Sequence, residues 1–179
     1  IQLDSIIIDA KSGVSGAGRS VKLDNHFAEV NESIKAYGVG THRHTPVIEE
    51  QLSYRAGVPV YLTFTPHLVP MQRGILAVCY ATLTEKYSWE DLHTIYEEYY
   101  GKERFIRLLP QNTYPETRWV KGSNYCDIGW KIDERTNRVI AIGAIDNLVK
   151  GAAGQAIQNM NLMFDLPEDM GIGQVPMFP

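Results

Sequence analysis

Short apolar runs separated by turn-forming residues predict that this chain is richer in strands than in helices. Runs of β-branched and aromatic residues are typical of strands, whereas helices need longer stretches with a period near 3.6 residues. The runs that predict strands cover residues 5–9, 58–65, 74–84, 105–108, 127–133 and 138–142. The run 74–84 contains neither proline nor charge, so we expect it to be central. The segment 66–70, with a proline at each end, is expected to kink or end the second run.

Two helices have clear start and stop signals. Thr45 and Pro46 predict the N-cap and first residue of a helix that stops at Gly57. Ser88 and Asp91 form a variant of the capping box for a second helix, which closes at Gly101. The aromatic residues of the second helix recur at helical spacing, so they are expected to pack in the core.

A third helix is predicted near the end of the chain, over residues 148–164, with Asp146 and Asn147 as its caps. Its expected buried stripe consists of Leu148, Ala152, Ile157, Met160 and Phe164. Residues 151–154 are all glycine or alanine, so another element or a ligand should lie close to the first turns.

These elements together predict the α+β class. Strands outnumber helices and do not alternate strictly with them, so we expect a mixed, largely antiparallel sheet with helices on one face. The length of 179 residues suits a single domain over residues 1–179. The chain starts with Ile1 rather than Met and almost inside a strand, so we expect it to be a piece of a longer protein.

Composition narrows the possible partners and location. Apolar residues are 44%, charged residues 21% and the net charge is −4. No basic run is present, which argues against nucleic acid and membrane surfaces as partners. No apolar stretch reaches the roughly 18 residues of a spanning helix. Cys79 and Cys126 are too few for a disulfide framework, so a reducing, cytoplasmic location is expected.

Two histidines at the start of the first helix are the strongest chemical signal. If residues 38–44 are extended, His42 and His44 point to one face and Arg43 to the other. Histidine can move protons near neutral pH, and helix starts favour anions. A metal pair is the alternative, but zinc needs at least three protein ligands, and the other histidines lack complementary spacing. We therefore expect no metal; His44 could equally be a structural histidine.

A glycine-rich segment follows the first strand. Residues 13–18 contain three glycines, which allow backbone N–H groups to form an anion-binding nest, and Arg19 adds a charge. The segment lacks the Gly-Lys-Ser/Thr of a Walker loop. A phosphate- or carboxylate-binding loop and a solvated turn both remain open on this pattern.

Five blocks of sequence, taken together, resemble N-acetyl-gamma-glutamyl-phosphate reductase of arginine biosynthesis. They are residues 12–19 (Ser-Gly-Val-Ser-Gly-Ala-Gly-Arg), 42–46 (His-Arg-His-Thr-Pro), 64–74 (Phe-Thr-Pro-His-Leu-Val-Pro and then Arg-Gly), 122–127 and 146–156. The chain lacks the family's Rossmann fingerprint and its Gly-Cys-aromatic-Pro-Thr nucleophile segment. The chain thus resembles only the C-terminal part, a domain of the glyceraldehyde-3-phosphate dehydrogenase-like fold.

The resemblance implies a role for each candidate residue. In this family a cysteine thioester, formed from an acyl phosphate, is reduced to an aldehyde with NADP as cofactor. His42 would be the general acid/base, and Asn147 would contact the nicotinamide amide. The implied substrate-binding residues are Ser12, Gly13, Ser15, Gly16, Arg19, Lys35, Tyr37 and His44.

The resemblance also implies partners. The last helix, residues 147–164, would pack on the protein's own Rossmann domain, which binds most of the NADP. Subunits would form homodimers or homotetramers around a small acyl phosphate substrate. Without the nucleophile segment, the chain by itself is expected to be inactive. Two alternatives stay open: a stand-alone binding or oligomerisation module, and the aminoadipyl-phosphate variant of lysine biosynthesis.

Overall fold

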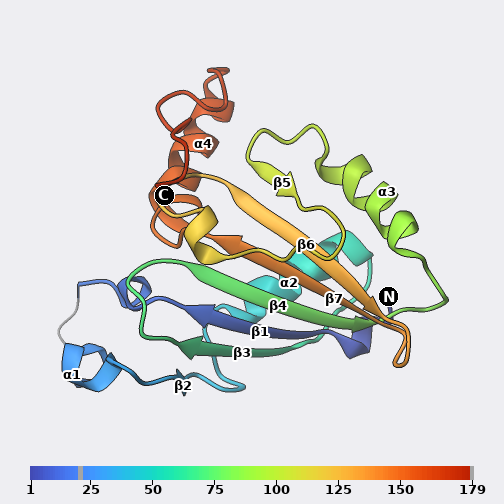
Figure 1. Ribbon diagram of the computed structural model, residues 1–179, viewed down its shortest axis with the longest axis horizontal. Coiled ribbons are helices and arrows are strands. Elements are labelled where there is room, and N and C mark those ends of the chain that lie inside the picture. The colour runs from blue at the N-terminus through green and yellow to red at the C-terminus, as the bar shows by residue number, and fades with distance from the viewer. Residues whose placement is uncertain (20–21, 178–179) are drawn as a thin grey trace.

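A seven-stranded mixed sheet forms the centre of the molecule (Figure 1). The computed structural model describes residues 1–19 and 22–177. The strands are β1 (Ile7–Ser12), β2 (Lys35–Ala36), β3 (Thr63–Leu68), β4 (Ile75–Thr82), β5 (Ile106–Leu108), β6 (Cys126–Asp133) and β7 (Arg138–Ile145). Their order is β2-β3-β1-β4-β7-β6-β5, and only the pairs β1–β3 and β5–β6 are parallel. The predictions of a largely antiparallel sheet and a central strand at 74–84 are confirmed.

In the part of the chain that the structure describes, four α-helices accompany the sheet: α1 (Phe27–Val30), α2 (Thr45–Ala56), α3 (Trp89–Tyr100) and α4 (Gly154–Met163). A π-helical turn, η5 (Val149–Ala153), leads into α4. The capping box of α3 is formed as predicted, since Ser88 Oγ accepts from Asp91 N at 3.1 Å and Asp91 Oδ2 accepts from Ser88 N at 2.8 Å. These bonds satisfy two of the orphan backbone donors at the start of α3.

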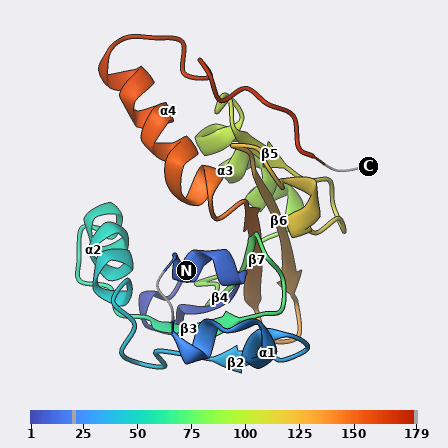
Figure 2. The ribbon, with the colours of Figure 1, turned by 90° about the vertical axis from the view of Figure 1, so that its left-hand side faces the viewer.

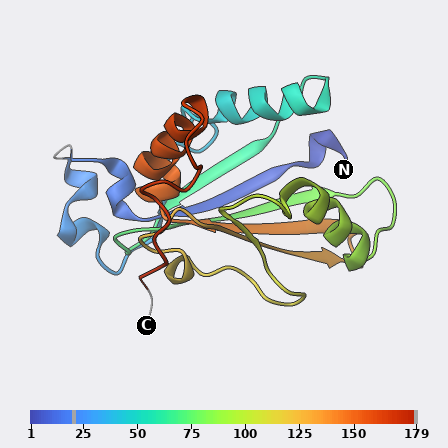
Figure 3. The same cartoon turned by 90° about the horizontal axis from the view of Figure 1, so that it is seen from above.

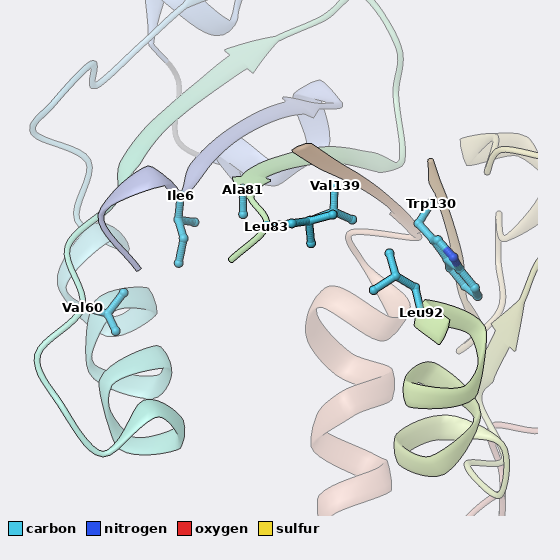
Figure 4. Close-up of a cluster of buried hydrophobic side chains, with 7 residues drawn as sticks. All are labelled: Ile6, Val60, Ala81, Leu83, Leu92, Trp130 and Val139. Atoms are coloured by element: carbon cyan, nitrogen blue, oxygen red, sulfur yellow. The ribbon is translucent and has the colours of Figure 1, made fainter. Parts of the chain in front are cut away.

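One face of the sheet, called here the helical face, carries the core. Figures 2 and 3 show α2, α3 and α4 on the same side of the twisted sheet, and α1 lies near the sheet edge formed by β2. The buried side chains of the core are Ile6, Val60, Ala81, Leu83, Leu92, Trp130 and Val139 (Figure 4). Leu52 of α2 and Tyr96 of α3 pack against them. The prediction that the helices share one face is confirmed.

The other side, called here the open face, is only partly covered and is mixed in character. The ion pair of Asp9 and Lys11 and the side chain of Lys131 share it with a set of apolar side chains. The strand register aligns Ile7, Tyr80 and Ile140 in one row, and Val78 with Ile142 in the next. None of these five side chains is fully buried. At the β6 end, backbone and side-chain atoms of residues 113–115 lie against Gly129 and cover that part of the face.

Two predicted strand boundaries are wrong. Residues 5–9 contribute to β1 only from Ile7, because a 3-10 turn occupies Leu3–Ser5. Residues 58–62 form no strand, because side chains of α2 bind their amides in place of a neighbouring strand. Ser53 Oγ accepts from Val60 N at 2.8 Å, and Glu49 Oε1 accepts from Leu62 N at 3.1 Å.

β3 ends at Leu68, inside the segment 66–70 that was predicted to kink or end it, although Pro66 itself lies within the strand. Thr63 N donates to Ile6 O and Val69 N donates to Ser12 O, so the odd-numbered amides of β3 face β1. The nitrogen of Pro66 therefore faces β2, which pairs over only two residues. Pro66 O accepts from Tyr37 N at 3.0 Å, so Pro66 keeps a ladder bond through its carbonyl and lacks only the reciprocal bond from its own nitrogen.

Helix α4 turns the opposite side inward from the one predicted. Its buried residues are Gly154, Gln158 and Asn161, whereas Met160 and Phe164 are 45% and 71% exposed. Gln158 Oε1 accepts from Asn124 Nδ2 at 2.9 Å, and Asn161 Nδ2 donates to two backbone carbonyls at 3.0 Å each. The inward side is determined by this polar network, so the prediction of a buried apolar stripe is wrong.

Candidate active site

The two histidines lie in a turn rather than in an extended segment. Gly38 and Gly40 have φ of +55° and +68°, and His44 has helical angles and occupies the N-cap position of α2. Thr45 is therefore the first helical residue, not the N-cap, and His44 caps no amide with its side chain. The turn still brings the rings of His42 and His44 together, with centroids 5.0 Å apart.

His42 sits in a small aromatic cage on the helical face. Its ring makes edge contacts with the rings of Tyr37 at 5.5 Å and Phe64 at 5.2 Å. His42 Nδ1 accepts from His44 N at 3.3 Å, which favours the neutral tautomer with hydrogen on Nε2. His42 is half-buried, whereas His44 is exposed.

The surroundings of His42 lower its pKa. Removal of the ring from water is the largest cause, followed by the charges of His44 and Arg43. Desolvation of the ring thus outweighs the neighbouring positive charges. A lowered pKa keeps the imidazole neutral at neutral pH, the state that a general base needs.

The glycine-rich segment uses its amides to hold itself in place. Residues Val14–Ala17 form the 3-10 turn η2. Gly13 N, Val14 N and Ser15 N donate to the carbonyls of residues 74, 71 and 72 at 2.9–3.1 Å. A Cβ on Gly13 would lie 2.9 Å from one of these carbonyls, so glycine is required there. The predicted anion nest is wrong for these amides, which leaves side chains as the groups available to an anion.

Asn147 fastens that segment to the rest of the site. Its Nδ2 donates to Ser15 Oγ at 2.9 Å, and its Oδ1 accepts from Gly74 N at 2.7 Å. The side chain of Asn147 is buried, and Ser12 Oγ and Asn147 Nδ2 both lie close to Gly16. We call Ser12, Ser15 and Asn147 the loop cluster.

Asp146 supports Asn147 from the core. Its Oδ1 accepts from Leu148 N at 2.8 Å, as the predicted helix cap, and its Oδ2 accepts from Gly122 N at 2.7 Å. Arg73 Nε lies 3.4 Å from the same Oδ2, which makes Arg73 a structural ion-pair partner of Asp146. Gly74, with φ +116°, was not predicted as part of this support, and no residue pattern distinguishes it from an ordinary turn glycine.

The remaining candidate site residues lie in two separate parts of the helical face. Tyr37 joins the cage of His42, and burial raises the pKa of its hydroxyl. Lys35 binds Asp24 instead, with Nζ 3.2 Å from Oδ1. Phe64 under the cage pairs with Ile8, whereas the loop cluster begins at Ser12. Those four residues along β1 correspond to about 13 Å, so the cage and the loop cluster share a face without touching.

Neither cysteine has the character of a nucleophile. Burial raises the pKa of Cys79, and it raises the pKa of Cys126 to about 11, so both stay as thiols at neutral pH. In the described part of the chain, no group of three or more His, Cys, Asp or Glu is placed to hold a metal ion. No helix among the described residues is long and apolar enough to cross a membrane.

Comparison with known proteins identifies the family to which this chain belongs. Residues 1–147 match the family model described as "Semialdehyde dehydrogenase, dimerisation domain", and the chain belongs to this family. It is 64% identical over its whole length to N-acetyl-gamma-glutamyl-phosphate reductase of Lachnospira eligens, and 57% identical to that of Geobacter metallireducens. It covers 52% of each, so the chain spans about half the length of these curated relatives.

Solved structures show the same fold at low sequence identity. Aspartate semialdehyde dehydrogenase II from Vibrio cholerae matches with a TM-score of 0.69 and 16% identity, over 89% of this chain and 54% of that one. A probable aspartate-semialdehyde dehydrogenase from Pseudomonas aeruginosa gives the same TM-score at 17% identity, over 91% and 56%. The expected architecture is therefore that of semialdehyde dehydrogenases.

Proposed function

We propose that the chain is the substrate-binding, proton-transferring and subunit-pairing half of an NADP-dependent reductase. The reaction converts N-acetyl-γ-glutamyl phosphate to N-acetylglutamate semialdehyde and phosphate. The observation that carries the proposal is the caged His42, with its lowered pKa, in a chain 64% identical to reductases of that name.

His42 handles the oxygen of the reacting carbonyl. In the tautomer selected by His44 N, His42 Nε2 donates a hydrogen bond and can stabilise a negative tetrahedral oxygen. For Nε2 to accept a proton, Nδ1 must carry hydrogen and release the His44 amide. The 3.3 Å contact is long for a hydrogen bond, so its loss costs little. His44, exposed beside His42, binds the substrate.

The other substrate contacts come from the loop cluster and its surroundings. Ser12 and Ser15 offer hydroxyl groups, and Gly13 and Gly16 let the backbone approach closely. Arg19 supplies a cationic fork for phosphate or carboxylate. Tyr37 lines the cage, and Lys35 acts through Asp24 rather than on the ligand.

Asn147 fits a contact with the nicotinamide carboxamide. One hydrogen of Nδ2 remains beyond the bond to Ser15 Oγ, and the bond from Gly74 N fixes which atom is the donor. NADP, when bound, supplies the hydride; the residues of this chain orient its amide and exclude water. The choice of NADP rather than NAD rests on the family resemblance.

The nucleophile comes from sequence that this chain does not contain. A cysteine thiolate there attacks the acyl carbon, phosphate leaves, and the thioester carbonyl then accepts hydride and a proton. The two protonated thiols described above support this division of labour, and their free state fits the cytoplasm. The outward apolar residues of α4 pack on the protein's own Rossmann domain, and the chain alone is inactive.

The open face is the subunit interface. Its rows of aliphatic and aromatic side chains are only partly covered, and a face of this kind suits pairing with a second copy about a two-fold axis. The same observation favours the second candidate function, a non-catalytic oligomerisation module. Activity measurements separate the two.

A chimaera tests the proposal. The half of the Lachnospira eligens reductase that this chain does not cover is joined to Ile1, and oxidation of N-acetylglutamate semialdehyde with phosphate is followed through NADPH formation. We expect turnover from the chimaera and none from the chain alone. A folded chimaera without turnover supports the oligomerisation module instead. Preference for the aldehyde with one more methylene supports the aminoadipyl variant.

A further inference from the structure

A cavity of about 470 Å³ lies beside the glycine-rich segment, on the side toward α1. Its lining consists of Val14, Ser15, Gly18, Arg19, Lys22, Asn25, His26, Phe27 and Gln72. Ser15 is thus shared between this cavity and the loop cluster, where it binds Asn147. The volume lies within the range of small-molecule sites, about 300–1,000 Å³.

The charges around this cavity are all of one sign. Arg19, Lys22 and His26 line it, and no Asp or Glu among the described residues does, in a chain whose net charge is −4. Within residues 1–19 and 22–177, neither Arg19 nor Lys22 makes a side-chain hydrogen bond or an ion pair. The nearby carboxylate of Asp24 is held by Lys35 instead, at 3.2 Å.

The polar groups of the lining are available to a ligand. His26 Nδ1 accepts from Ala28 N at 3.4 Å, which favours hydrogen on Nε2 as a donor. Ser15 Oγ keeps its own hydrogen, because it acts as acceptor toward Asn147. The Gln72 amide adds a donor from a third segment. Five side chains from three parts of the chain thus meet there with donor groups.

We propose that this cavity binds a small anion through the cations Arg19 and Lys22, with His26, Ser15 and Gln72 as neutral donors. The ligand carries a phosphate or a carboxylate group, which cationic side chains bind by charge-assisted hydrogen bonds. This inference rests on the proposed function for Ser15 and Arg19, which are already assigned to the substrate there, and it adds Lys22, His26 and Gln72 from the cavity lining.

Titration of the ¹⁵N- and ¹³C-labelled chain by NMR tests the site, with inorganic phosphate in one arm and N-acetylglutamate in the other. We expect saturable shifts of the His26 ring and of the amides of Ser15 and Lys22. Tighter binding of phosphate identifies a phosphoryl group as the ligand's anion, and tighter binding of N-acetylglutamate identifies a carboxylate. Absence of saturable shifts in both arms overturns the proposal, and this measurement needs only the unmutated chain.

Substitutions then test the named side chains. Lys22→Gln and His26→Gln should each weaken binding of the preferred anion about tenfold, the loss of roughly one charged hydrogen bond. Lys102→Gln, a matched loss of an exposed lysine outside the lining, should leave binding unchanged. Equal binding by Lys22→Gln and the parent chain, or equal weakening by Lys102→Gln, contradicts the assignment. Reductase activity is not used here, so failure removes the anion contacts proposed for Ser15 and Arg19, whereas the role proposed for His42 is tested separately by turnover.

Discussion

The identity of the key residues was readable from the sequence, but their geometry was not. The Pro46 signal places a helix after His44, and the side-by-side histidines indicate proton chemistry. Two glycines with positive φ then fold the segment into a turn, which the assumption of an extended segment missed. The rings meet because of the turn and not because of strand alternation. The cage residue Phe64 comes from a distant strand and could not be identified from sequence.

The pH response of His42 tests the cause of its lowered pKa. Arg43→Gln removes a nearby positive charge, so the pKa of His42 should rise toward the ordinary histidine value. The ring signal of His42 in an NMR pH titration reports the change. Arg135→Gln, in the remote β6–β7 turn, serves as the matched control and should not move it. An unchanged titration in Arg43→Gln would mean that burial and His44 account for the whole shift.

The same depressed pKa links His42 to stability. Because the unfolded chain binds the proton more readily, the free energy of unfolding should fall as pH drops below about 6.5. Replacement by Asn should flatten that part of the stability curve in denaturant titrations at several pH values. A curve that keeps its full slope in His42→Asn assigns the acid sensitivity to other groups.

Asn147 should matter for stability as well as for any ligand. Asn147→Ala leaves the buried amide of Gly74 without its acceptor, at a cost of about 1–3 kcal/mol in the free energy of unfolding. Denaturant unfolding gives this number, and hydrogen exchange at Gly74 N should accelerate. The control is Asn159→Ala on the exposed side of α4, where about 0.5 kcal/mol or less is expected. Equal stability of both variants would contradict the inference that Asn147 holds the glycine-rich segment in place.

At the scale of elements, local sequence patterns predicted well whether a segment is a helix or a strand. They predicted poorly which residues that segment binds or packs against. The capping box of α3 and the apolar run of β4 depend on neighbouring residues, and both were right. Residues 58–62 look like a strand but bind the side chains of Ser53 and Glu49, a tertiary detail without a local signal. In α4 the helical period was right, but the inward side was decided by Asn124.

The close packing inferred from the small residues at the start of α4 can be tested at Gly154. A Cβ there would lie 2.3 Å from Asn124 Oδ1 and 2.8 Å from Val149 O. Gly154→Ala should therefore lower the free energy of unfolding by about 1–3 kcal/mol, as overpacked sites do. Gly173→Ala is the matched control, because its nearest contact is an ordinary 3.5 Å. A neutral Gly154→Ala would show that the junction of η5 and α4 can relax.

At the scale of the whole molecule, the open face predicts self-association. Val78→Arg places a charge in the middle of that face, where desolvation opposes pairing. Sedimentation should show the parent chain as a dimer or larger, and Val78→Arg as a 20.2 kDa monomer. Thr136→Arg, at the exposed β6–β7 turn, should sediment like the parent. A monomeric parent, or an associating Val78→Arg, would place the interface elsewhere.

The most direct measurement of the central claim is the turnover number of the chimaera with and without His42. General acid/base assistance is worth about 10²–10⁴ in rate, so His42→Asn should lower turnover by that factor, with cofactor affinity nearly unchanged. His44→Asn should mainly raise the Michaelis constant for the aldehyde. Near-normal turnover in His42→Asn, with turnover lost in His44→Asn, would reverse the two roles. Near-normal turnover in both variants would contradict the account, because the proton would then be moved by another group.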